Sequence, residues 1–265
     1  MCSSVQIIVV LVVALAASTA NALPTSDVHW RPFQLFMKAH KRNYTNDRET
    51  THRYGIFMEN LRRIADLNAR GGAKHGVNQF TDLSPEEFKK TYLGSHFKQP
   101  HNRTRSHRLP TSTLATTPSV DWRTSQPAVI SAVKNQGQCG SCWAFSATET
   151  IESCHALTTG TPVKTGSPEQ IVDCDGAADG CNGGFPHLAF EYVESVGGLE
   201  CEASYPYTAG GDCSFDKADI CLPAPTSWRF VSQSAAGEKD MFAQIAISPF
   251  SIAADAESWQ TYSPS

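Results

Sequence analysis

A long stretch of this chain contains no cysteine, and no long apolar run follows the N-terminal segment. None of the nine cysteines in the 265 residues lies between positions 23 and 138. After residue 17 no apolar run reaches the roughly 20 residues that a membrane-spanning helix needs. The net charge of −4 and the pI near 6.1 lack the basic balance typical of nucleic-acid-binding proteins. These absences argue against nucleic-acid binding and membrane spanning, and they divide the chain into a cysteine-free and a cysteine-rich part.

The first 22 residues have the pattern of a secretory signal peptide. Val5–Ala17 is almost wholly apolar but too short to span a bilayer, and Ala20-Asn21-Ala22 has the small-x-small pattern of a cleavage site. We therefore expect the mature protein in the secretory pathway, in lysosomes or outside the cell. In proteins that enter this pathway, cysteines are more often paired in disulfides than bound to metals. Asn43 and Asn102 each begin a glycosylation sequon that is usable there.

A long helix is predicted from Glu49 onward. Six positions at spacings of three and four fall on one narrow stripe of a 3.6-residue helix: Glu49, Arg53, Phe57, Asn60, Ile64 and Asn68. The glycine pair 71–72 ends the helix. Because charged, amide and apolar residues share the stripe, it must face polar groups as well as a core.

A short extended segment and a second helix are predicted to follow. Gly76, Asn78, Phe80 and Asp82 alternate, as in a strand. Ser84-Pro85-Glu86-Glu87 forms a capping box with proline at the first helical position, so we expect a short helix through residue 92.

The stripe, the Gly-x-Asn-x-Phe-x-Asp pattern and Phe88 together resemble the inhibitory propeptide of papain-family cysteine proteases, in the cathepsin L-like branch. The resemblance implies a helical propeptide module over residues 23–93 and a linker with the processing site over residues 94–117. It also implies that the propeptide runs through the active-site cleft in a non-productive direction.

The stretch QGQCGSCWAFS, residues 136–146, is open to several interpretations on its cysteine spacing alone. Cys139 and Cys142 could hold a metal, form a redox pair or a disulfide, or include a nucleophile. A zinc site would need a second ligand pair at regular spacing, which Cys174 and Cys181 do not form. A thioredoxin-type pair would need a preceding strand in a βαβ unit.

The residues after Cys142 favour a nucleophile. Apolar residues continue at helical spacing until Gly160: Ala144, Ala147, Ile151, Cys154 and Leu157. Cys142 is thus expected at a helix N-terminus, where free N–H groups and the helix dipole stabilise a thiolate and lower its pKa. A thiolate is the nucleophile that acyl transfer requires.

Cys139-Gly140-Ser141-Cys142-Trp143 is similar to the active-site signature of the same family. The resemblance implies an α+β papain-like peptidase domain over residues 118–265, with a helical left domain and only the beginning of a β-rich right domain. It makes Cys142 the nucleophile and Gln136 the side-chain oxyanion donor. It places Gly183 and Gly184 against the substrate backbone and assigns the apolar side-chain pocket to Phe185, Pro186 and Ala253.

The resemblance also implies disulfides Cys139–Cys181 and Cys174–Cys213. Cys154, Cys201 and Cys221 remain, and Cys201–Cys221 is one candidate bridge. Tyr205-Pro206-Tyr207 is family-like and is interpreted as packing. No metal or cofactor is expected.

The histidine and asparagine that complete this catalytic site in the family follow the cysteine by roughly 130–150 residues, which lies beyond Ser265. We therefore expect a truncated zymogen, inactive as written. The implied partners are protein and peptide substrates, its own propeptide and cystatin-type inhibitors, and the implied state is a monomer. The alternatives are a propeptide-type inhibitor and a catalytically dead binding protein.

Overall fold

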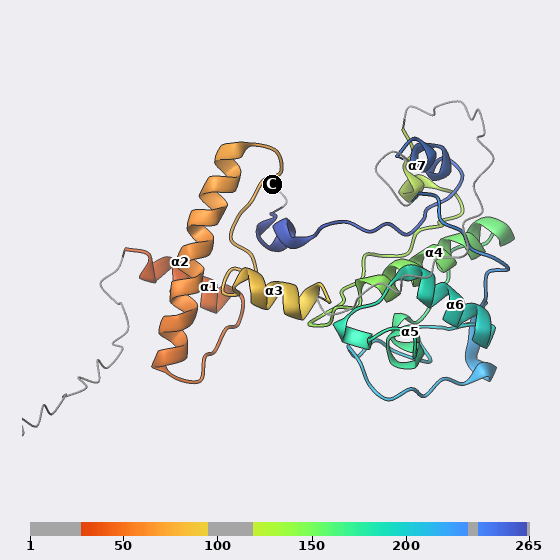
Figure 1. Cartoon of the computed structure of the whole chain (residues 1–265), viewed down its shortest axis with the longest axis horizontal. Coiled ribbons are helices and arrows are strands. Elements are labelled where there is room, and N and C mark those ends of the chain that lie inside the picture. The colour runs from red at the N-terminus through yellow and green to blue at the C-terminus, as the bar shows by residue number, and fades with distance from the viewer. Residues whose placement is uncertain (1–27, 95–118, 233–237, 264–265) are drawn as a thin grey trace, which may run out of the picture. The chain divides into compact units, whose positions relative to one another are not determined.

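The computed structural model describes residues 28–94, 119–232 and 238–263, which form two compact units (Figure 1). The first unit contains the described residues up to Asp82 together with Ser263, and the second runs from Leu83 to Tyr262. The predicted signal peptide, the processing linker after Gly94 and the Asn102 sequon lie outside the described residues.

Two helices and an aromatic cluster make up the first unit. The helices are α1 (Trp30–Ala39) and α2 (Asp47–Arg70). Their buried aromatic side chains pack on one another at ring-centroid distances near 5–6 Å: Trp30, Phe33, Phe36, Tyr54 and Phe57. The Asn43 sequon is exposed between the helices, and its glycosylation stays a prediction.

The mixed stripe of α2 faces polar groups as well as a core, as predicted, and the structure places those polar groups in the segment that follows the helix. Phe57, Asn60 and Ile64 are buried. The Arg53 Nη1 donates to Asp82 O at 3.1 Å, and the Asn60 Nδ2 donates to Thr81 O at 2.9 Å. Arg53 and Asn60 thus bind main-chain oxygens of the segment after the helix. Gly71 ends the helix, as the sequence predicted.

The predicted strand over residues 76–82 is wrong. The backbone turns there, with Thr81 N donating to Asn78 O at 3.1 Å and Phe80 N donating to Asn78 Oδ1 at 2.9 Å. An asparagine side chain that binds the backbone two residues ahead favours a turn over a strand. Asp82, at the end of the turn, is held by Arg42 and by the Tyr44 hydroxyl.

The second unit is built around three helices. They are α4 (Cys142–Thr159), α5 (Pro168–Cys174) and α6 (Pro186–Val196), and α3 (Pro85–Tyr92) precedes them (Figure 1). The buried core between the helices combines alanines with branched aliphatic side chains: Ala144, Ala147, Ile151, Ile171, Ala189, Val193, Leu199 and Leu222. Cys154 and Leu157, predicted on the same apolar face of α4, are instead exposed.

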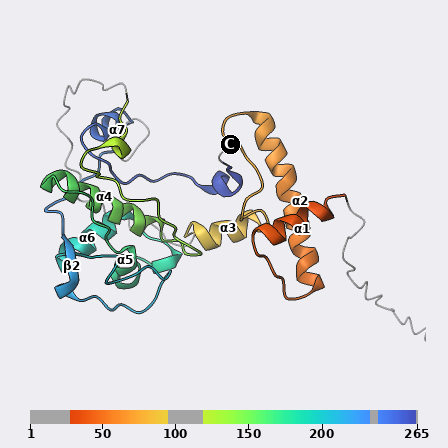
Figure 2. The ribbon, with the colours of Figure 1, turned by 180° about the vertical axis from the view of Figure 1, so that it is seen from behind.

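Short elements close the second unit. β1 (Gly198–Glu200) pairs antiparallel with β2 (Ile220–Pro223), which lies beside the helices (Figure 2). Single turns occur at η1 (Trp122–Thr124), η2 (Gly180–Asn182) and η3 (Lys217–Asp219). In the described residues after 223, the elements are α7 (Glu238–Ile245) and η5 (Glu257–Thr261). Among the described residues, no helix combines the length and apolar character needed to cross a membrane.

Replacing Asn60 by alanine is expected to lower the free energy of unfolding of the first unit by about 1–3 kcal/mol, because Thr81 O would lose its partner in a buried environment. Asn68→Ala is the matched control, since Asn68 also donates to a main-chain oxygen, at His75, but is exposed to water. Urea unfolding of the whole chain measures both. An equal effect of the two substitutions would contradict the role assigned to Asn60.

Candidate active site

The segment before α4 places Cys142 at the N-terminus of that helix, as predicted. Ser141 is the N-cap residue and is fully buried, whereas Cys142 is exposed. The Cys139–Cys181 disulfide and a 2.8 Å bond from Gly140 N to Cys181 O join this segment to the η2 region. The thiol therefore sits on a segment that is covalently held on one side and helical on the other.

Gln136, the predicted oxyanion donor, uses its side-chain amide twice. Its Nε2 donates to Cys139 O at 2.7 Å and to Tyr92 O, at the end of α3, at 2.9 Å. The first bond orients the side chain toward the segment that carries Cys142. In the second bond, the main-chain oxygen of Tyr92, at the end of the predicted propeptide helix, accepts from the amide that is predicted to bind the substrate oxyanion.

Gly94, two residues after the end of α3, lies between the cysteine segment and the glycine loop. A Cβ atom on Gly94 would lie 2.8 Å from Gly183 Cα, and one on Gly140 would lie 2.6 Å from Gly94 Cα. Glycine at these positions allows three backbones to approach one another closely. α3 itself is bound to η5 through the Lys89–Glu257 ion pair and a bond from Gln260 Nε2 to Leu83 O.

The predicted substrate loop packs directly on Trp143, the residue after the predicted nucleophile. A Cβ on Gly184 would come within 2.5 Å of the Trp143 ring, whose Nε1 donates to Gly180 O at 3.2 Å. Gly183 has φ of 124°, which disfavours other residues. The structure thus requires the glycines that the sequence singled out.

The three predicted pocket residues come from two places. Pro186 opens α6, and the Phe185 ring packs on His187 at 5.5 Å between ring centroids. Ala253 is exposed and follows Ser251, whose Oγ donates to Ser146 O on α4. A wall that combines Ala253 with Phe185 stays a prediction.

The predicted lowering of the Cys142 pKa is wrong for the chain as described. Desolvation by surrounding protein atoms raises the pKa of this thiol, and the N–H groups of Trp143 and Cys142 lower it by less. No imidazole among the described residues contributes. The helix N-terminus acts in the predicted direction, but without a neighbouring cation it does not outweigh desolvation.

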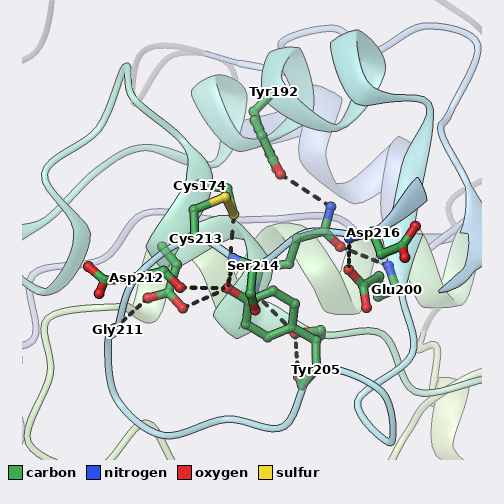
Figure 3. Close-up of a disulfide and its surroundings, with 12 residues drawn as sticks. Cys174, Tyr192, Glu200, Tyr205, Gly211, Asp212, Cys213, Ser214 and Asp216 are labelled. Carbon is green, nitrogen blue, oxygen red and sulfur yellow. Dashed lines mark hydrogen bonds between the residues drawn. A yellow bond between two sulfur atoms is a disulfide. The ribbon is translucent and has the colours of Figure 1, made fainter. Parts of the chain in front are cut away.

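All three predicted disulfides are formed, including the candidate bridge Cys201–Cys221. Cys174–Cys213 lies beside the Tyr205 hydroxyl, which donates to Asp173 Oδ2 and accepts from Ser214 N (Figure 3). Cys154 is free and exposed. No group of three or more His, Cys, Asp or Glu in the described part of the chain could hold a metal ion.

Sequence reasoning missed one contact of this site. Tyr207, interpreted as packing, places its hydroxyl 2.7 Å from Gln136 O and 2.7 Å from Ser141 Oγ. No spacing rule could have shown this, since Tyr207 is distant from both residues along the chain. Only the turn between Cys201 and Tyr205 brings it there.

Two carboxyls near the site have raised pKa values. Desolvation raises the pKa of Glu202, while Tyr207 N–H and Lys134 lower it by less. Desolvation also raises the pKa of Asp175, whose Oδ2 is buried. Both carboxyls therefore keep a proton to a higher pH in the folded state than an ordinary carboxyl does.

Two family models match the chain. The model described as Papain family cysteine protease matches residues 116–265, and the Cathepsin propeptide inhibitor domain (I29) matches residues 33–88. Cysteine proteinase 3 of Solanum lycopersicum is 40% identical over 192 residues, covering 71% of this chain and 52% of that protein. Cysteine proteinase 7 of Dictyostelium discoideum is 34% identical over 267 residues, covering 97% of this chain and 56% of that protein. The chain thus spans about half the length of these curated relatives.

Solved structures of precursors show the same fold. A recombinant stem bromelain precursor superposes with a TM-score of 0.75 at 29% identity, covering 90% of this chain and 76% of that one. The digestive procathepsin L2 proteinase from Tenebrio molitor larval midgut gives a TM-score of 0.65 at 34% identity, covering 73% of this chain and 65% of that one.

Replacing Glu202 by glutamine is expected to flatten the pH dependence of the free energy of unfolding. A raised carboxyl pKa stabilises the fold fully below the ordinary value of about 4.3, and this stability is lost as pH rises through the raised value. The glutamine side chain would keep an acceptor for Tyr207 N–H but remove the desolvated charge, so the variant loses less stability above about pH 4.3.

Urea unfolding at several values between about pH 4 and pH 7.5 measures this effect across the window. Asp212→Asn is the control, because Asp212 is exposed. Parallel stability curves for wild type and Glu202→Gln would show that Glu202 does not retain a proton in the folded state.

Proposed function

The chain belongs to the papain family of cysteine proteases, and on that premise we propose that it is the zymogen form of a cathepsin L-like endopeptidase. The observation that carries the proposal is the arrangement at the N-terminus of α4. Cys142 is exposed there, Gln136 directs its amide to the same segment, and the glycine loop packs on Trp143.

The proposed reaction begins with the Cys142 thiolate. Its sulfur attacks the carbonyl carbon of the substrate, a C–S bond forms and the carbonyl electron pair moves to oxygen. The Gln136 amide and the Cys142 N–H would stabilise that oxyanion. The oxyanion then collapses, the C–N bond breaks and the leaving nitrogen takes a proton from the imidazole that the family uses as acid. Water attacks the thioester carbon and gives its proton to that imidazole, the C–S bond breaks, and the acid leaves with the thiolate restored. Gly183 and Gly184 allow the substrate backbone to approach, and Phe185, Pro186 and Ala253 would favour an apolar side chain two residues before the cut.

The region around α3 supports a zymogen. Tyr92 O accepts from the Gln136 amide, and Gly94 lies against Gly183 and Gly140, so a substrate could not occupy the same positions. The match of residues 33–88 to the propeptide inhibitor domain supports the same interpretation. Secretory entry, with a lysosomal or extracellular destination, agrees with the three disulfides, and cystatin-type inhibitors are the expected protein partners.

The protein isolated from its natural source and treated with mild acid is expected to cleave peptides with an apolar residue at the second position before the cut. Cys142→Ala should abolish this activity, while Cys154→Ser should leave it unchanged because Cys154 lies 12 residues further along α4, about 18 Å away. Turnover of a fluorogenic peptide measures both. Full activity of Cys142→Ala would refute the proposed nucleophile.

Residues 1–265 taken alone are proposed to lack turnover. The amine needs a proton donor, yet His155 is 13 residues along α4, about 20 Å from Cys142. His187 packs among the rings of Phe185, Trp228 and Phe230. Acid-treated chain that both hydrolyses a peptide and is labelled at Cys142 by an epoxide reagent would contradict this. Sequencing the 3′ end of the transcript shows whether the natural chain is longer.

A second candidate function is inhibition of related proteases by the propeptide region. The match of residues 33–88 to an inhibitor domain favours it. Residues 23–115, as a separate chain, would then block a related papain-like protease at nanomolar concentration. No inhibition at micromolar concentration would exclude this function.

A further inference from the structure

We propose that Tyr207 is a positioning residue that keeps the N-terminus of α4 open for Cys142 by holding the Ser141 hydroxyl and the Gln136 main chain. The inference rests on Cys142 being the nucleophile of the proposed function. The sequence indicated a packing role for Tyr207, and the structure shows that its hydroxyl also makes two hydrogen bonds.

The direction of the two hydrogen bonds is determined by the protons available. The Tyr207 hydroxyl donates its single proton to Gln136 O at 2.7 Å. The contact of 2.7 Å with Ser141 Oγ therefore has Ser141 as the donor and the phenol oxygen as the acceptor. One phenol oxygen thus joins the residue that carries the oxyanion donor to the residue that precedes the nucleophile.

Ser141 behaves differently from the other serine N-caps in the described part of the chain. Ser84 accepts from Glu87 N, and Ser167 accepts from Gln170 N, as N-cap serines usually do. Ser141, although fully buried at the N-cap of α4, makes no side-chain cap. Its hydroxyl is held by Tyr207 instead. Ala144 N donates to the Ser141 main-chain oxygen at 2.9 Å, and the first two N–H groups of α4, those of Cys142 and Trp143, are not taken by a Ser141 side-chain cap.

The N–H groups of Cys142 and Trp143 favour the charged form of the Cys142 sulfur. The N–H groups of Trp143 and Cys142 both lower the pKa of the Cys142 thiol. An N-cap serine accepts from the second or third helical N–H. In α4 the third, Ala144 N, already donates to Ser141 O, so the Trp143 N–H is the donor that a free Ser141 hydroxyl would take. A Ser141 hydroxyl released from Tyr207 would therefore compete with the Cys142 sulfur for the Trp143 N–H group.

Tyr207 is itself rigidly placed. Its N–H donates to Glu202 Oε1 at 2.9 Å, and its ring packs edge-on against Phe145 of α4 at 4.7 Å. Glu202 follows Cys201, which is bonded to Cys221. On the other side, Tyr205 and the Cys174–Cys213 disulfide attach the same loop to the end of α5 (Figure 3). The loop can therefore impose a position on Ser141.

The test is the pH profile of Cys142 alkylation by iodoacetamide, followed by mass spectrometry in the 1–265 chain carrying Cys154→Ser. Tyr207→Phe is expected to move the midpoint upward by about half a pH unit, which is about threefold less thiolate at a fixed pH below the midpoint. Adding Ser141→Ala to Tyr207→Phe removes the competing hydroxyl, so the midpoint should return to the starting value.

Tyr205→Phe is the matched control. It removes a tyrosine hydroxyl that binds Asp173 and Ser214 in the same loop, and it should lower the melting temperature without moving the midpoint. An unmoved midpoint in Tyr207→Phe would overturn the proposal. So would a shift that persists in the double variant. Neither result depends on turnover, whereas a fully active Cys142→Ala would overturn the nucleophile itself.

Discussion

The Cys139–Cys181 disulfide is the constraint on which the site depends. It joins the segment that leads into α4 to the loop that leads into α6, and the Gly140 N to Cys181 O bond lies beside it. Because a disulfide removes relative freedom of the two segments in the unfolded and folded chain, the nucleophile and the substrate loop keep one spacing. This spacing requires glycine at position 184, because a side chain there would collide with the Trp143 ring.

A buried carboxylate on α4 holds the residues that precede Gln136. Glu152, on α4, is fully buried and accepts from Ser131 Oγ, from Gly166 N and from Lys134 Nζ, the latter at 2.6 Å. Removing one partner of such a buried pair typically costs about 3–5 kcal/mol, because the other charge is left without compensation. Lys134 lies two residues before Gln136. Gln136, the predicted oxyanion donor, is therefore fixed by an ion pair two residues before it and by the Tyr207 hydroxyl.

Local features were predictable because their causes are local. Helix α2 and its mixed stripe, the Ser84 capping box and the start of α4 at Cys142 all follow from periodicity and capping within a few residues. The strand expected over residues 76–82 failed for the opposite reason. Alternation suits a strand only where a partner strand is present, and here the polar side chains of α2 bind the backbone while Asn78 forms a turn.

The sequence by itself determined the family, and it singled out Cys142 as the predicted nucleophile and the glycine loop as the predicted substrate loop, because each depends on residue types at fixed spacings. Tertiary structure alone decided what those residues experience. It placed Tyr92 O on the Gln136 amide, brought Tyr207 to Ser141, and surrounded Cys142 with enough protein to raise its pKa. Desolvation and hydrogen-bond competition depend on atoms from segments far apart in the chain, and no local pattern encodes their distances.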